Sequence, residues 1–396
     1  MHSYPDAPAV VRALSPDEPV ILNRPHAAAR AARFFVEKFP GKSLYAVKAN
    51  PSPELLRVLW DSGVTHYDVA SIAEVRLVRG TLPEATLCFM HPIKSQAAIA
   101  EAYAEHGVRT FSLDSHEELD KIVAATGGAE DLALCVRLRV SSDYSELSLA
   151  SKFGVDLVDA APLLQATRQV ADSLGICFHV GSQAMTPFAY VQAMERVRAA
   201  IVDASVTVDI IDVGGGFPSI YPGMEPPPLE DYFGAIYRAA ESLPVSYSSE
   251  LWCEPGRALC AEYNSMIVRV ERRRGNELYI NDGAYGALYD AAHVGWRFPV
   301  RCLNDARGEA EGEFAFYGPT CDDADYMEGP FQLPADIQPG DYIEVGMLGA
   351  YGAAMKTAFN GFGQAHALDT SDEPMASQYR GDRRDPRHSD NVVSLR

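Results

Sequence analysis

Eight short apolar runs recur between residues 44 and 257, and this repetition constrains the fold more than any other feature of the sequence. Segments with the apolar period of a helix, such as 115–127 and 187–205, lie between them, and another, 27–40, precedes the first run. Strands that alternate with helices form parallel sheets, and eight units in a row are typical of a closed (β/α)8 barrel. A doubly wound open sheet is the alternative, but it rarely needs eight such units. We therefore predict an α/β fold with a TIM-type barrel over residues 24–262.

The sequence changes character after the last apolar run. Segments such as "NSMIVRVERRR" and "DYIEVGML" are rich in β-forming residues and are separated by turn residues. They predict a C-terminal, mostly antiparallel β domain over residues 263–366, to which residues 1–23 contribute an N-terminal strand ending in "PVIL". The polar stretch 367–396 is expected to be a disordered tail.

Composition narrows the class of partner. The 396 residues carry a net charge of −20, and no long basic tract precedes the C-terminal stretch, which argues against nucleic acid or an anionic membrane as partner. The N-terminus lacks an apolar signal core, and no run reaches the ~18 apolar residues of a membrane span. The seven cysteines are scattered and lack metal-ligand spacing. We therefore expect a cytoplasmic protein with reduced thiols and without a metal site.

Chemically distinctive residues follow several of the predicted barrel strands. Lys48 follows the first, Asp68 the second and His179 the sixth, whereas Gly214–Gly216 follow the seventh and Glu254–Arg257 the eighth. Barrel enzymes place their chemistry at the carboxyl ends of the strands, so these residues are expected to meet on one rim. Their convergence carries more weight than any one of them.

Taken singly, each of these motifs has an ordinary structural interpretation. A lysine at a strand end is usually solvated, three glycines can form a mere turn, and a histidine can be structural. At the rim, however, a partly desolvated Lys48 would have a lowered pKa and could form an imine with an aldehyde. Gly214–Gly216 would offer backbone N–H groups to one phosphate, Glu254 a carboxylate to a ring nitrogen, and His179 a flat ring for stacking. These are the groups that pyridoxal phosphate requires.

The motifs "YAVKAN", "FHVGSQ", "DVGGGFP", "EPGR", "NDGAYG", "GPTCD" and "GAYGAAMKTAFNGF" identify a resemblance. Over about residues 20–366 the chain resembles the fold-type III, alanine-racemase-like decarboxylases that use pyridoxal phosphate, within the ornithine/lysine decarboxylase group. The resemblance implies that Lys48 holds the cofactor as an imine, Glu254 pairs with its ring nitrogen and His179 stacks on its ring. It implies further cofactor contacts from Asp68, Arg137, Ser182, Gly214, Gly215, Gly216, Gly256, Arg257 and Tyr351.

The same resemblance assigns roles in the predicted β domain. It implies that Cys321 returns a proton to Cα after CO2 leaves, and that Asp322 crosses the interface of a homodimer to hold the distal amine of the substrate. Asp290 would be a companion carboxylate, with Tyr289 and Phe359 as further substrate contacts. Two carboxylates aimed at one site repel each other unless a cation lies between them, and a basic amino acid supplies that cation.

The expected reaction is conversion of L-ornithine to putrescine and CO2, in a homodimer with shared active sites. Decarboxylation of L-lysine or of meso-diaminopimelate is the alternative; Gln183 and Asp323 depart from the ornithine decarboxylase pattern, and "TCD" departs from the "C-E-S-x-D" of diaminopimelate decarboxylases. A non-catalytic regulatory relative is an outside alternative. It would be expected to have lost several of the residues that this chain retains, among them Lys48, Glu254 and Cys321.

Overall fold

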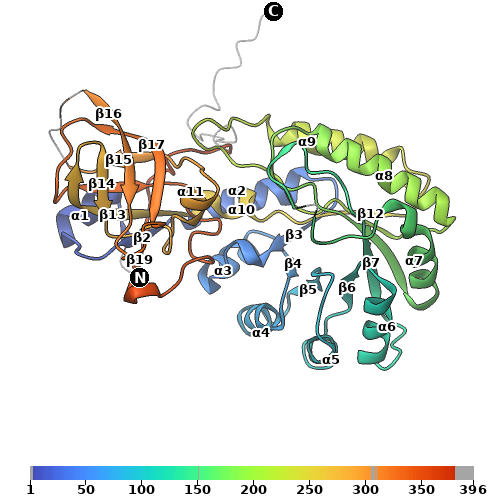
Figure 1. The fold of residues 1–396 in the computed structure, drawn as a ribbon. Coiled ribbons are helices and arrows are strands. Elements are labelled where there is room, and N and C mark those ends of the chain that lie inside the picture. Colours follow the sequence, from blue (N-terminus) through green and yellow to red (C-terminus); the bar gives the residue numbers. More distant parts are fainter. Residues whose placement is uncertain (1–2, 150, 305–307, 309, 380–396) are drawn as a thin grey trace, which may run out of the picture.

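The computed structural model consists of a barrel and a β domain that lie side by side (Figure 1). It describes residues 3–149, 151–304, 308 and 310–379. The barrel is closed by eight parallel strands that pair in the order β11-β12-β3-β4-β5-β6-β7-β9, which confirms the predicted architecture. These strands are β3 (Lys42–Ala46), β4 (His66–Val69), β5 (Thr86–Phe89), β6 (Thr110–Leu113), β7 (Ala133–Arg137), β9 (Ser173–Cys177), β11 (Ile210–Asp212) and β12 (Glu250–Cys253).

Helices surround the barrel, and their starts are encoded locally. The hydroxyl of Ser115 accepts the backbone N–H of Glu118 at 3.2 Å and caps α6, and Ser71 and Ser95 cap α4 and α5 in the same way. The barrel helices are α2 (Pro25–Lys38), α3 (Pro53–Asp61), α4 (Ile72–Thr81), α5 (Gln96–Ala104), α6 (His116–Ala125), α7 (Leu157–Val170), α8 (Phe188–Ala204), α9 (Leu229–Glu241) and the short α10 (Arg257–Cys260).

The β domain is built on one nine-stranded sheet that joins segments from both ends of the chain. Its long strand β13 pairs antiparallel with β2, so the predicted N-terminal strand is present. The sheet is mixed, since β19 runs parallel to β1 and β2, and β14 runs parallel to β16. The remaining strand pairs are antiparallel, so the predicted, mostly antiparallel character is confirmed. The strands are β1 (Ser3–Tyr4), β2 (Val20–Asn23), β13 (Asn264–Arg274), β14 (Glu277–Ile280), β15 (Val300–Cys302), β16 (Glu311–Tyr317), β17 (Tyr326–Pro334), β18 (Tyr342–Val345) and β19 (His366–Thr370), accompanied by α1 (Ala7–Leu14) and α11 (Tyr289–His293).

The predicted disordered tail is wrong over residues 367–379. Strand β19 pairs with β2 from His366 onward, and Tyr379 is buried, with its hydroxyl donating to the carbonyl of Ala258 at 2.6 Å. The stretch is polar overall and is held by single buried residues such as Tyr379, which do not produce a periodic apolar pattern in the sequence. Residues 380–396 of that predicted tail lie outside the described residues. No helix in the described part of the chain is long and apolar enough to cross a membrane.

Candidate active site

A cavity of about 380 Å³ opens at the carboxyl ends of the barrel strands, and it falls in the usual size range of small-molecule sites. Most of the residues predicted to bind the cofactor line it. They are Lys48, Asp68, Arg137, His179, Ser182, Gly215, Gly216, Glu254, Gly256, Arg257 and Tyr351. Gly214 shapes the turn beneath the cavity without lining it.

Lys48 lies in a single 3₁₀ turn, Val47–Ala49, that directly follows β3. Its Nζ lies 3.2 Å from Oδ2 of Asp68, at the end of the neighbouring strand β4. Burial disfavours the ammonium form, but nearby negative charge, above all the Asp68 carboxylate, outweighs burial and raises the pKa of Lys48 above its ordinary value. The lowered pKa expected from the sequence is therefore wrong, because the strand register brings anionic partners that a single apolar run does not disclose.

The three glycines after β11 permit a tight turn. Gly214 has φ +68°, and a Cβ there would lie 2.0 Å from the carbonyl oxygen of Phe178. Gly216 has φ +100°, and a Cβ there would lie 2.5 Å from the carbonyl oxygen of Gly181. Side chains are therefore excluded at both positions, and the turn presents bare backbone to the cavity.

His179 presents a neutral ring. Its Nδ1 accepts the backbone N–H of Gly181 at 3.0 Å. Burial, together with the positive charges of Lys48 and Arg137, lowers the pKa of His179 well below its ordinary value. A fixed, uncharged imidazole is suited to stacking on a flat ring.

Arg257 occupies the end of the cavity between the two domains. Nη1 of its guanidinium donates to the Tyr221 hydroxyl at 3.0 Å, and Nη2 donates to Asp290 at 3.3 Å. Among the described residues, none accepts a hydrogen bond from Nε. Nearby, a Cβ at Gly256 would lie 3.1 Å from Cβ of Ala49, so the chain approaches closely there. A buried guanidinium with an unused donor beside a bare glycine turn fits a phosphate group.

The sequence reasoning missed several residues of the site. His91, Lys152 and Phe153 line the cavity, and the rings of His91 and Phe153 lie 5.0 Å apart. Asp212 lies fully buried at the end of β11, next to Glu254. His91 and Asp212 each follow or end a barrel strand, so the rule that selected Asp68 would have found them. Lys152 and Phe153 lie on a loop and carry no such signal.

The residues assigned to the substrate do not all reach this cavity within one chain. Cys321 and Asp322 line a separate space of about 620 Å³ on the β domain. The backbone N–H of Cys321 donates to Oδ1 of Asn360 at 3.1 Å, and the Tyr285 hydroxyl donates to Asp322. Asp290 instead pairs with Arg257 at the barrel cavity. The two carboxylates expected to share one substrate amine thus have different surroundings in the single chain: Asp322 lines the space on the β domain, and Asp290 contacts Arg257.

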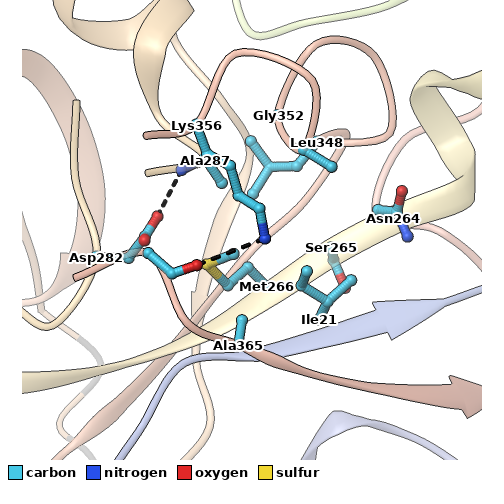
Figure 2. A pocket seen from close by; sticks show the side chains of 12 residues that line it. Ile21, Asn264, Ser265, Met266, Asp282, Ala287, Leu348, Gly352, Lys356 and Ala365 are labelled. Atoms are coloured by element: carbon cyan, nitrogen blue, oxygen red, sulfur yellow. Dashed lines mark hydrogen bonds between the residues drawn. The ribbon is translucent and has the colours of Figure 1, made fainter. Parts of the chain in front are cut away.

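The other two predicted contacts also lie in the β domain. Phe359 packs on the Tyr285 ring at 5.0 Å, and Tyr289 packs on His293 at 4.5 Å. A further, small cavity under the segment that carries Phe359 has about 20 Å³, just above the ~10–15 Å³ that one water needs. Figure 2 shows Asp282 and Lys356 beside it. Its size excludes an amino-acid substrate.

Comparison with known proteins places the chain in a family. Residues 26–261 match the pyridoxal-binding domain of pyridoxal-dependent decarboxylases, and residues 178–349 match the C-terminal sheet domain of the same enzymes. A lysine/ornithine decarboxylase of Selenomonas ruminantium is 30% identical over 339 residues, which cover 83% of this chain and 84% of the relative. Antizyme inhibitor 2 of Xenopus laevis is also 30% identical, over 353 residues that cover 82% of this chain and 74% of the relative.

Solved structures agree with the sequence matches. The arginine decarboxylase of Paramecium bursaria Chlorella virus, bound to agmatine, superposes with a TM-score of 0.82 at 26% identity, over 91% of this chain and 98% of that chain. The match covers both the barrel and the β domain, and the cavity is lined by the lysine, carboxylate, guanidinium and glycine turn described above. This chain belongs to the family of pyridoxal-dependent decarboxylases, and its cofactor is pyridoxal phosphate.

Proposed function

We propose that the protein decarboxylates basic L-amino acids, with L-ornithine, which yields putrescine and CO2, as the preferred substrate and L-lysine as a second one. The observation that carries this proposal is the pairing of a complete cofactor cavity in the barrel with an acidic loop, Asp322–Asp323, beside Cys321. The Selenomonas relative bears the name of a lysine/ornithine decarboxylase, which supports the same substrate class.

In this proposal the barrel residues hold the cofactor. Lys48 binds its aldehyde, Glu254 faces the ring nitrogen, and the neutral ring of His179 packs on its face. Arg257 and the backbone around Gly215 and Gly216 hold the phosphate. When bound, pyridoxal phosphate accepts the electron pair that remains when CO2 departs.

The β domain supplies the remaining groups from the second subunit of a homodimer. Cys321 and Asp322 lie away from Lys48 in one chain, and the adjacent segment exposes the apolar side chains of Phe359 and Phe362. Exposed apolar side chains beside reactive groups indicate a surface that another protein covers. A two-fold axis would place the Cys321 loop of each subunit at the barrel cavity of the other, giving two equivalent sites.

Substrate charge follows from the same arrangement. In the dimer, Asp322 of one subunit and Asp290 of the other would flank the distal ammonium of the substrate. The loop 320–325 carries three aspartates and neither lysine nor arginine. The additional carboxylate of diaminopimelate would find no positive partner on this loop, so diaminopimelate should be rejected.

A product assay on ornithine, lysine, arginine and diaminopimelate, side by side, tests the substrate. We expect the highest kcat/KM for ornithine, slower turnover of lysine, and none in the Lys48→Ala control. A higher kcat/KM on diaminopimelate than on both ornithine and lysine would overturn the substrate proposal. Absence of turnover on all four, with cofactor attached to Lys48, would favour a regulatory role like the one named in the Xenopus relative.

Mixing of inactive chains tests the shared site. Lys48→Ala and Asp322→Ala homodimers should each be inactive, whereas a mixed dimer contains one intact site. Random exchange gives half mixed dimers, so about a quarter of the wild-type sites should return. If activity stays absent although labelled subunits exchange, each site is built within one chain.

A further inference from the structure

Asp212 is the last residue of β11, and Glu254 directly follows β12, the neighbouring barrel strand that pairs with β11. Gly214 links the two residues. Its N–H donates to Oδ1 of Asp212 at 2.8 Å, and its carbonyl accepts the N–H of Glu254 at 2.8 Å. Asp212 is 0% exposed and Glu254 is 8% exposed. The backbone therefore holds two carboxyl groups side by side in the barrel interior.

The second oxygen of Asp212 has an unusual environment. Among the described residues, no N–H or side-chain hydroxyl donates to Oδ2 of Asp212. The carboxyl group of Glu254 interacts with the Asp212 side chain, and it is the neighbouring group that could supply a proton to this oxygen. Two carboxylates only repel each other, so an unpartnered buried oxygen beside a second carboxyl group favours a pair that holds one proton.

Other titratable groups face the pair from the surrounding strands. Asp68 adds a negative charge, and Lys48 and Arg137 add positive charges. The neutral ring of His179 lies beside the same turn. Four buried thiols whose pKa is raised by burial surround the pair and stay uncharged: Cys88, Cys135, Cys177 and Cys253.

We propose that Asp212 is a positioning residue that keeps Glu254 protonated in the cofactor-free protein, and that this proton is the one delivered to the ring nitrogen of pyridoxal phosphate. The O–H bond of Glu254 breaks and an N–H bond forms with the lone pair of the ring nitrogen. Glu254 is left as the carboxylate that faces the new cation. The barrel interior keeps the same net charge, so no charge has to enter a buried site from solvent.

The electrostatics of the pair agree with this order of protonation. Burial and the neighbouring Asp212 raise the pKa of Glu254 well above its ordinary value. Burial raises the pKa of Asp212 only to about 6, because the N–H of Gly214 and the Glu254 hydrogen bond favour its anionic form. In this proposal the proton lies on Glu254, the carboxyl group whose pKa is raised further.

Infrared spectroscopy of the full-length chain without cofactor tests the shared proton. The stretch of a protonated carboxyl group should be present in the wild type and weaker by one group in Asp212→Asn and in Glu254→Gln. Asp209→Asn is the matched control, because Asp209 precedes the same strand at its other end and pairs with Arg168. Difference spectra between wild type and variant cancel the contribution of Asp282, whose pKa is raised by burial to about 7.

Calorimetry of cofactor binding in buffers of different ionisation enthalpy tests the proposed transfer of the Glu254 proton to the ring nitrogen. At a pH where the ring nitrogen of free pyridoxal phosphate is unprotonated, Asp212→Asn should take up about one more proton per bound cofactor than wild type. The reason is that the asparagine amide donates to Glu254 and leaves it anionic beforehand. Asp209→Asn should behave as wild type, and Asp212→Ser repeats the test if Asp212→Asn does not fold.

The two measurements have separate contradicting outcomes. An unchanged carboxyl stretch in Asp212→Asn would overturn the shared proton. A lost stretch with unchanged proton uptake would overturn the delivery, which rests on the proposed pairing of Glu254 with the ring nitrogen. Neither measurement uses an amino-acid substrate, so failure of the proposed substrate specificity would leave both results intact.

Discussion

Nη2 of Arg257 lies 3.3 Å from Oδ2 of Asp290, and this ion pair joins the start of α10 in the barrel to α11 in the β domain. Both side chains are largely buried. Asp290 therefore contacts Arg257, the residue proposed to hold the cofactor phosphate, before any substrate is present. In the proposed function a substrate ammonium would share this carboxylate with the guanidinium, which would couple substrate binding to the residue proposed to hold the cofactor phosphate.

Replacement of Asp290 should separate its contact with Arg257 from its proposed contact with the substrate ammonium. A charge-assisted hydrogen bond to the distal ammonium contributes roughly 1.5–3 kcal/mol, so Asp290→Asn should raise KM for ornithine by about ten- to a hundredfold. The loss should be smaller for an amino acid that lacks the distal amine. The cofactor should not bind more weakly, because Arg257 loses an anion that competes with phosphate. Equal losses for both amino acids, measured by steady-state kinetics, would contradict the substrate role of Asp290.

The pKa of Lys48 should respond to Asp68. Since the Asp68 carboxylate raises the pKa of Lys48, Asp68→Asn should lower it. More of the lysine is then neutral near pH 8, and attachment of pyridoxal phosphate to the cofactor-free chain should be faster there than in wild type. The rate of attachment between pH 7 and pH 10 gives the measurement, with the exposed Asp61→Asn as control. Superimposable pH profiles for Asp68→Asn and wild type would show that Asp68 does not set the pKa of Lys48.

Loss of the Cys321 thiol should change the products more than it changes CO2 release. Without a placed donor, the proton is added at a wrong carbon, and aldehyde accumulates beside the diamine. General acid catalysis contributes ~10²–10⁴-fold, so formation of the correct diamine by Cys321→Ala should fall by at least ~10²-fold. Parallel assays of CO2 and diamine measure this split. Stoichiometric diamine at the wild-type rate would place the proton donor elsewhere.

The segment after residue 366 should contribute to stability. Tyr379→Phe leaves the carbonyl of Ala258 without its buried donor, which should lower the free energy of unfolding by about 1–3 kcal/mol. Deletion from residue 367 should cost more, because it removes most of β19 along with Tyr379. Urea unfolding measures both changes. A deletion that leaves the unfolding midpoint unchanged would mean that β19 adds nothing to the sheet.

Much of the fold follows from local pattern. Each of the eight barrel strands overlaps one of the apolar runs, although β3, β9 and β12 begin before theirs. The helices α6 and α8 lie within their predicted segments. Burial on both faces of a strand and the helical period each leave a direct mark in the sequence. The cofactor cavity was predictable for the same reason: a residue at the carboxyl end of a parallel strand has only one rim on which to lie. Lys48, Asp68 and His179 meet there as expected.

Tertiary structure decided what depends on pairs of residues far apart in the chain. The sequence predicted a lowered pKa for Lys48. The register of β3 and β4, however, sets the Asp68 carboxylate beside Lys48, and the pKa of Lys48 is raised. The sequence also shows Asp212 and Glu254 as separate acids 42 positions apart. Only the pairing of β11 with β12 makes them neighbours in a medium that solvates two charges poorly, and this is the physical reason for the proton that we propose they share.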